Sequence, residues 1–261
     1  MDLGLTGKRA LVLASTRGLG RAIAEALAAE GAKVLLAGRS EEKLATVAAA
    51  IRATGGTVEH VLADLSDPAA VDAIERGVDE KLGGIDILVN NTGGPPPGRM
   101  VDADLSVMAA QFDTMVMRVC EITARLLPKM RAQKWGRVIT VGSSGVIQPL
   151  TNLGLSNALR ASLVGWSKSL SNDLAADGIT VNMLLPGRIH TERVDELDAA
   201  ASKRTGKTIE ETREAAKAAI PAGRYGTPAE FAAVAAFLAS EQASYITGSQ
   251  IRVDGGAIRS L

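Results

Sequence analysis

The chain has few of the residues that would build a disulfide framework or a basic surface. One cysteine, Cys120, occurs among 261 residues, so no disulfide can form within the chain. Cys120 lies in a helical pattern with Val119 and Ile122, which favours a buried small hydrophobe, with a reactive thiol as the alternative. Neither sign of charge prevails, since Lys plus Arg and Asp plus Glu number 29 each. No global basic field would attract nucleic acid, and we expect none as a partner.

Long hydrophobic runs are also missing. The N-terminus carries Asp2 and reaches an apolar run only as long as a strand, which is too short for a signal peptide or a membrane span. We therefore expect a cytoplasmic protein without a membrane partner. No proline- or serine-rich linker and no internal repeat divides the chain, so residues 1–261 are predicted to form a single α/β domain.

The first motif present is a glycine turn between an apolar run and a helical pattern. The run Ala10–Ala14 enters Ser15–Gly20, and a helical pattern follows at Ala22–Leu27. Such a turn lets backbone N–H groups at a helix N-terminus face a pyrophosphate, with glycines where a Cβ would keep the backbone from the ligand. Many strand-to-helix turns carry glycines for conformational reasons alone, so other motifs must agree.

Polar or glycine clusters follow the later apolar strands as well, including the strands expected at 136–141 and 179–182. The clusters are Gly38-Arg39-Ser40, Asp64-Leu65, Asn90 to Gly94, Gly142-Ser143-Ser144 and Pro186 to Thr191. Strands and helices alternate regularly until about Pro186, which predicts an α/β fold with a doubly wound parallel sheet and helices on both faces. Ligands of open parallel sheets bind at the carboxyl ends of the strands, where these clusters are expected to meet.

Three further motifs occur in order along the chain. They are the asparagine-asparagine-x-glycine cluster Asn90–Gly93, the proline-glycine-x-x-x-threonine element Pro186–Thr191 and the terminal Asp254-Gly255-Gly256. With them the sequence resembles the short-chain dehydrogenase/reductase family over nearly its whole length. The resemblance implies a Rossmann-like fold and hydride transfer between a nicotinamide cofactor and a carbonyl or alcohol substrate. Ala14 replaces the first glycine of the family's turn, and we expect its methyl group to be tolerated if the turn is slightly wider.

By this resemblance the cofactor site consists of the glycine turn and the strand ends. The residues implied are Ser15, Arg17, Gly18, Leu19, Gly20, Arg39, Asp64, Leu65, Asn91, Thr92, Gly93, Arg160, Pro186, Gly187, Ile189 and Thr191. No metal site is expected.

Charge indicates which cofactor would bind. An acidic residue after the second strand would repel a 2′-phosphate, but Gly38 and then Arg39 stand there, and Arg17 adds a second guanidinium at the same end. In the family, basic residues at these places go with NADP(H), which is the cofactor we predict. The alternative is that both arginines are solvated surface residues.

The catalytic residues that the family uses are changed together. The family places a serine after the fifth strand, a tyrosine thirteen residues on, a lysine four residues further, and an asparagine in the preceding long helix. Ser143 matches the serine, whereas Ser156, Arg160 and Met115 stand at the other three positions. Both tyrosines of the chain fall near its carboxyl end, so neither replaces the proton donor.

The remaining residues suggest another route to catalysis. If Asn152 to Leu174 is one helix, Ser156 and Arg160 share a face that points to the cleft lined by Ser143. We interpret these three as catalytic: Arg160 would hold the nicotinamide ribose and place a positive charge near a developing alkoxide, while the hydroxyls donate hydrogen bonds. Water or His190 would supply the proton, although a lone histidine after a strand is more often a polar rim residue.

Two functions of different class follow. The first is an NADP(H)-dependent oxidoreductase, similar to 3-oxoacyl reductases, with an altered proton-transfer site. The second is a catalytically silent NADP(H)-binding sensor or regulatory protein of the same fold. Isomerisation or dehydration in the same pocket stays open, and one sequence does not identify the substrate.

Residues 191–222 interrupt the alternation with two helical patterns, at 194–201 and 209–220. Thr208 and Glu211 stand at capping-box spacing at the start of the second pattern. We expect this segment to form a lid over a small-molecule substrate. The alternative is a solvated helical pair on the rim.

Small residues recur in the helical pattern after Asn152, at Ala158, Ala161, Ser162 and Gly165. Such residues allow a second helix to approach closely, and family members usually pair through this helix. We predict a homotetramer. The alternative is that these residues seat the helix on its own sheet.

Overall fold

The computed structural model describes residues 2–260, which form one sheet of seven parallel strands in the order β3-β2-β1-β4-β5-β6-β7. Because every pair of neighbouring strands is parallel, the carboxyl ends of all strands lie at the same edge. The predicted Rossmann-like doubly wound fold is confirmed. The strands are β1 (Arg9–Val12), β2 (Lys33–Gly38), β3 (Thr57–Leu62), β4 (Ile87–Asn90), β5 (Gly136–Val141), β6 (Ile179–Pro186) and β7 (Gln250–Val253).

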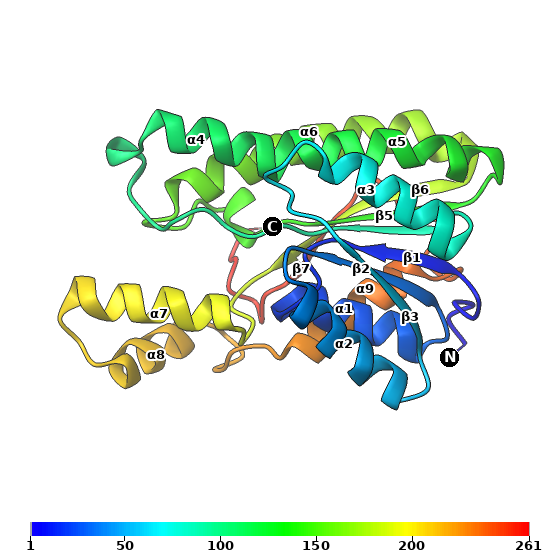
Figure 1. Cartoon of the computed structure of the whole chain (residues 1–261). Helices are drawn as coiled ribbons and strands as arrows, with labels where there is room; N and C mark the ends of the chain where they lie inside the picture. Colours follow the sequence, from blue (N-terminus) through cyan, green and yellow to red (C-terminus); the bar gives the residue numbers. More distant parts are fainter. Residues whose placement is uncertain (1, 261) are drawn as a thin grey trace.

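Helices cover both faces of the sheet (Figure 1). One face carries α1 (Gly18–Ala29), α2 (Glu41–Ala53) and α9 (Pro228–Ala239), whose buried residues form one apolar core with the strands. The other face carries α3 (Ala70–Gly77), α5 (Arg118–Ala132) and α6 (Gly154–Leu174), with α4 (Leu105–Phe112) beyond the sheet edge. Within residues 2–260, no helix is long and apolar enough to cross a membrane.

Two strand ends differ from the sequence prediction for local reasons. The strand expected at Ala10–Ala14 ends at Val12, because Ala14 takes a left-handed conformation with φ +47° and turns the chain out of the sheet. The strand expected at 179–182 runs on to Pro186, because Met183 to Pro186 pair with β7. The fifth strand has the predicted bounds.

Helices α7 (Glu192–Thr205) and α8 (Ile209–Ala218) form an antiparallel pair that projects beyond the carboxyl edge of the sheet (Figure 1). Thr208 and Glu211 make the predicted capping box: the Thr208 side chain accepts from the Glu211 N–H, and the Glu211 carboxylate accepts from the Thr208 N–H. The helical excursion expected at 191–222 is therefore present. Its role as a substrate lid stays a prediction.

Cys120 lies in α5 and packs against an apolar cluster between α5 and α6. Burial and the neighbouring Glu121 carboxylate raise the pKa of its thiol to about 11. The thiol is thus protonated at neutral pH, which fits the interpretation of a small hydrophobe rather than a reactive nucleophile.

Candidate active site

The glycine turn places the N-terminus of α1 at the carboxyl edge of the sheet. Arg17 is the residue before the helix, and Gly18 begins it with φ +55°. A Cβ on Gly20 would lie 2.5 Å from the Ala14 carbonyl oxygen and 2.6 Å from Asn91 Nδ2, so only glycine fits there. The first N–H groups of α1 are directed beyond the helix end, as an anionic ligand requires.

Asn91 joins the end of β4 to this turn. Its side-chain N–H donates to the carbonyl oxygens of Leu13 and Ala14, both at 3.2 Å. Two predicted cofactor segments, the glycine turn and the asparagine cluster, are thereby held together. The bond also fixes the Ala14 carbonyl in the left-handed conformation that a non-glycine residue rarely adopts.

Three of the predicted cofactor residues turn their side chains inward. Ser15 is fully buried, and its hydroxyl accepts a hydrogen bond of 3.1 Å from the Ala37 N–H at the end of β2. Leu19 and Ile189 pack against the core on the α1 and α9 side of the sheet. These residues can meet a cofactor only through their backbone atoms, a distinction that sequence motifs do not make.

Arg39 stands exposed directly after β2. Within residues 2–260 no carboxylate lies within ion-pair distance of it, but its charge contributes to a lowered pKa of Asp64, after the larger effect of the hydrogen bonds from Ser66. Gly38 leaves no space for a side chain, because a Cβ would lie 2.7 Å from Thr16 Cγ2. The strand β2 is therefore followed by a basic residue, whose guanidinium has no ion pair within residues 2–260.

Arg17 contacts the lid, although its side chain stays 53% exposed to solvent. Its guanidinium is 3.0 Å from Glu196 in α7, and this bond lowers the pKa of Glu196. A hollow of about 380 Å³ lies beside this contact, lined by Gly18, Arg21, Ala22, Glu25, His190, Thr191, Glu192, Asp195 and Pro228. The lid therefore begins against the glycine turn, at the predicted residues Gly18 and Thr191.

Arg160 lies where the ends of β4 and β5 meet, as counting along the sequence predicts. It is 9% exposed, and its guanidinium donates to the carbonyl oxygens of Val141 at 2.9 Å and Gly93 at 3.2 Å. Burial, followed by the nearby positive charge of Arg193, lowers its pKa to about 10, which still leaves it charged at neutral pH. A fixed positive charge is thus present at the centre of the site.

The other catalytic positions lie on the elements expected. Ser143 follows β5, and its hydroxyl accepts from the Gly145 N–H at 3.0 Å, which leaves its own O–H free to donate. Ser156 is half-buried in the first turn of α6, one turn before Arg160. Met115 lies in a π-helical turn (Asp113–Met117) between α4 and α5 and is 1% exposed among apolar side chains. The position at which the sequence predicts the family's asparagine thus holds an apolar side chain.

The sequence did not predict a buried polar cluster beneath the lid. Asp198 of α7 is fully buried, lies 2.5 Å from the Arg188 guanidinium and accepts a bond of 3.0 Å from the Tyr225 hydroxyl. Burial raises the pKa of Tyr225, so this tyrosine is a weak acid used to anchor the lid. His190 is exposed, 3.6 Å from Asp195, which fits its interpretation as a rim residue.

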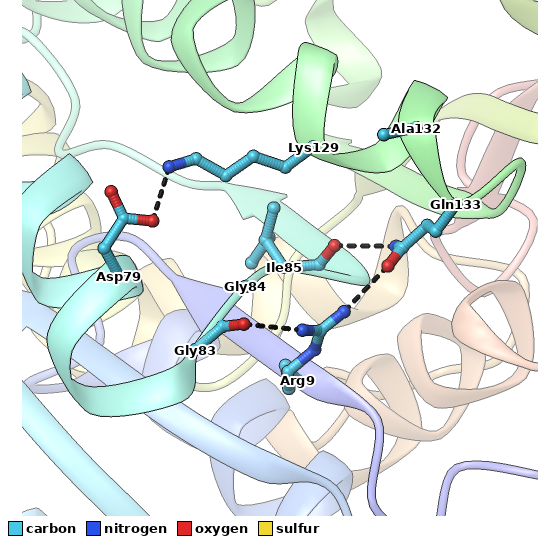
Figure 2. A pocket seen from close by; sticks show the side chains of 8 residues that line it. All are labelled: Arg9, Asp79, Gly83, Gly84, Ile85, Lys129, Ala132 and Gln133. Atoms are coloured by element: carbon cyan, nitrogen blue, oxygen red, sulfur yellow. Dashed lines mark hydrogen bonds and ion pairs between the residues drawn. The ribbon is translucent and has the colours of Figure 1, made fainter.

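A second hollow, of about 460 Å³, lies at the opposite edge of the sheet (Figure 2). Its charged groups satisfy one another: Arg9 donates to the Gly83 carbonyl oxygen at 2.9 Å and to Gln133 at 2.8 Å, and Lys129 pairs with Asp79. It lies away from the strand ends that hold the motifs. The candidate active site is therefore the carboxyl edge.

The parallel sheet and its glycine turn define a dinucleotide-binding α/β protein. A family model described as enoyl-(acyl carrier protein) reductase matches residues 13–257. A 3-oxoacyl-(acyl-carrier-protein) reductase of Salmonella typhimurium is 36% identical over 259 residues, which cover 97% of this chain and 98% of the relative. The chain belongs to the short-chain dehydrogenase/reductase family, a family of oxidoreductases.

Solved structures agree with this assignment. The L-sorbose reductase of Gluconobacter frateurii, complexed with NADPH and L-sorbose, superposes with a TM-score of 0.94 at 33% identity, covering 100% of each chain. An NADPH-dependent reductase involved in bacilysin biosynthesis superposes with a TM-score of 0.93 at 31% identity, covering 98% of this chain and 100% of the other.

Proposed function

We propose that the protein is an NADP(H)-dependent oxidoreductase that transfers hydride between the nicotinamide and a carbonyl or alcohol substrate, with an altered proton-transfer site. The observation that carries the proposal is the buried Arg160 at the meeting point of β4 and β5, where it donates to the carbonyl oxygen of Val141, two residues before Ser143. A 3-oxoacyl-reductase-like activity is the expectation that the Salmonella relative supports.

The residues present fit the cofactor. The N-terminus of α1, closed to side chains at Gly20, would hold the pyrophosphate, and Arg39 would meet the 2′-phosphate. Arg17 would join it once its contact with Glu196 opens. Bound NADP(H) supplies the hydride acceptor or donor. The strand ends would hold the rest of it through Asp64, Leu65, Asn91, Thr92, Gly93, Pro186, Gly187, Ile189 and Thr191.

Arg160 would act on the charge that develops during reduction. When the carbonyl carbon gains hydride, its oxygen becomes an alkoxide, and the Arg160 guanidinium with the hydroxyls of Ser143 and Ser156 would stabilise that oxygen. Neither hydroxyl is a useful acid at neutral pH, and arginine keeps its proton. Water at the exposed side of the site would then supply the proton to the alkoxide.

The second candidate is an NADP(H)-binding sensor or regulatory protein without turnover. It is favoured by one observation: no tyrosine hydroxyl is near Arg160 among residues 2–260, since Tyr225 is bonded to Asp198 and Tyr245 is fully exposed. General acid catalysis is worth about a hundred- to ten-thousandfold, so its loss slows a reductase without abolishing it.

The test is NADPH oxidation with a panel of ketones, quinones and 3-oxoacyl thioesters, together with calorimetric titration of NADPH. We expect tight NADPH binding and slow oxidation with at least one class. Binding without oxidation across the panel would favour the sensor, and absence of NADPH binding would refute both proposals.

We also propose a homotetramer. Ala158, Ala161, Ser162 and Gly165 are all exposed on α6, and a Cβ on Gly165 would meet nothing within 4 Å. The buried face of α6 carries other residues, which supports this proposal over the alternative that these four seat α6 on its own sheet. A monomeric mass by light scattering at micromolar concentration would refute the tetramer. The cytoplasmic location stays a prediction.

A further inference from the structure

Arg193 in the first turn of α7 lies against the loop that follows β4. Its Nη2 donates to the Pro95 carbonyl oxygen at 2.7 Å, and a Cβ on Gly94 would lie 3.1 Å from the same nitrogen. Its Nη1 is 3.4 Å from Glu196, a carboxylate that also pairs with Arg17 at 3.0 Å. Arg193 is therefore held at the edge of the candidate active site by a carbonyl oxygen and a shared, distant carboxylate.

Arg160 contacts Gly93, the residue directly before the Gly94 that Arg193 lies against. It donates to Gly93, while Arg193 lies across Gly94 and Pro95, so two guanidinium groups flank three consecutive residues. Their charges repel, since the Arg193 charge helps to lower the pKa of Arg160. Among residues 2–260, no carboxylate lies within 4 Å of the Arg160 guanidinium, whose recorded acceptors are both carbonyl oxygens.

This arrangement is unfavourable in the absence of an anion. A buried charge is stabilised when it is paired. Arg160 has no carboxylate partner within residues 2–260, and Arg193 shares its one carboxylate, Glu196, with Arg17, so both guanidinium groups are underpaired. The cofactor phosphates are expected elsewhere, at the N-terminus of α1 and at Arg39. A neutral ketone would leave the positive charge beside Gly93 to Pro95 uncompensated, whereas a carboxylate matches the planar donor fork of arginine.

We propose, resting on the proposed function, that the substrate is a keto acid whose carboxylate binds Arg193 while its carbonyl oxygen faces Arg160. The carboxylate replaces the weak contact of Arg193 with Glu196. Because Arg193 belongs to the lid, the substrate charge also holds α7 against the loop after β4.

The experiment uses NADPH-loaded protein and three pairs of probes: pyruvate, acetoacetate and levulinate, each against its methyl ester. The pairs vary the distance between carbonyl and carboxylate, and each ester keeps the carbonyl while removing the charge. Calorimetric titration measures binding, and absorbance of NADPH measures turnover. We expect at least one acid to bind about tenfold or more tightly than its ester, the effect of a hydrogen bond to a charged group.

Variants assign the preference to Arg193. Arg193→Gln, which keeps a donor toward Pro95 without the charge, should lower the acid-to-ester preference about tenfold, and Arg193→Lys should keep part of it. The matched control is Arg204→Gln, an exposed arginine on the same helix, which should leave the preference as in the native protein. Thermal unfolding of each variant shows that α7 is still folded.

Two outcomes overturn the proposal: equal binding of every acid and its ester by the native protein, or an acid preference that Arg193→Gln leaves unchanged. Failure of the proposed function looks different. Acid preference that depends on Arg193 without any NADPH oxidation would refute hydride transfer and keep the carboxylate site. Oxidation with the esters and thioesters but no acid preference would keep the proposed function and refute the keto acid.

Discussion

The two halves of the candidate active site differ in what builds them. The half around β1 and β4 is built mainly from backbone atoms. Gly20 has no space for a side chain, and the side-chain amide of Asn91 donates to the carbonyl oxygens of the turn. The half around β5 and α6 relies on side chains, and there the sequence predicts that Met115, Ser156 and Arg160 stand in place of three residues that the family uses. A site made by backbone geometry survives with the fold, whereas a site made by side chains can be rebuilt without disturbing it.

Ala14 and Met115 show the same contrast in detail. Ala14 has the left-handed φ of +47° that glycine adopts most easily, and the Asn91 side chain donates to its carbonyl oxygen. Met115 keeps its place in the helical path but fills it with an apolar side chain. Ala14 is thus compatible with the turn, whereas Met115 places an apolar side chain where the sequence predicts a polar one.

The largest expected effect comes from restoring the side-chain half. Ser156→Tyr combined with Arg160→Lys should speed reduction of a neutral ketone such as cyclohexanone by about a hundredfold, the lower end of general acid catalysis, because Met115 still lacks the asparagine's polar group. Either change alone should help little, since a tyrosine needs the neighbouring ammonium to lower its pKa. NADPH oxidation rates of the four proteins measure the coupling, and a full gain from Ser156→Tyr alone would contradict it.

Arg39→Ala tests the charge at the end of β2. It should weaken NADPH binding roughly ten- to a hundredfold and leave NADH nearly unaffected, because only NADPH carries the 2′-phosphate. Arg76→Ala, an exposed arginine of α3, is the matched control and should alter neither. Equal losses for both cofactors would show that Arg39 acts structurally, and tighter native binding of NADH would refute the charge argument.

Gly20→Ala tests the backbone half. The added Cβ would lie 2.5 Å from the Ala14 carbonyl oxygen, so the turn must shift, at about 1–3 kcal/mol of unfolding free energy and with weaker NADPH binding. Gly98→Ala is the control, because a Cβ there meets nothing within 4 Å, and it should change stability by less than about 0.5 kcal/mol. Urea unfolding compares the stability of the two variants. Similar losses of unfolding free energy would mean that the contacts with Ala14 and Asn91 do not restrict Gly20.

Ala14→Gly should have the smallest effect. It relieves a left-handed alanine, worth roughly 1–2 kcal/mol, but adds freedom to the unfolded chain, so we expect a gain of about 0.5–1 kcal/mol in unfolding free energy. The midpoint of urea unfolding measures this gain, with the dependence of the unfolding free energy on urea concentration expected to stay the same. A loss of stability would mean that the methyl group is itself packed.

The backbone half was predictable because its signals are local. Apolar strands followed by glycine or polar clusters indicated the sheet and its carboxyl edge, and counting from Ser143 placed Arg160, whose guanidinium does meet β4 and β5. The sequence was less informative where a motif residue serves the fold. Ser15 belongs to the glycine turn, yet its hydroxyl is bonded to Ala37.

The lid contacts could not be predicted from the sequence. The two helices and the capping box follow from local periodicity, but the position of α7 depends on the tertiary path of the chain. The contacts of Arg193 with Pro95 and of Arg17 with Glu196 join residues far apart in sequence. The burial of Asp198 between Arg188 and Tyr225 is likewise invisible in a helical pattern rich in charge.

The central claim is that Arg160 has taken over the chemistry of the side-chain half. The most direct test is NADPH affinity and NADPH oxidation by the native protein and by Arg160→Ala, with the most active substrate of the panel. The account predicts that both fall, by roughly tenfold or more each, because the guanidinium holds the ribose and stabilises the alkoxide. Native turnover that survives Arg160→Ala undiminished would contradict the account and place the chemistry elsewhere in the cleft.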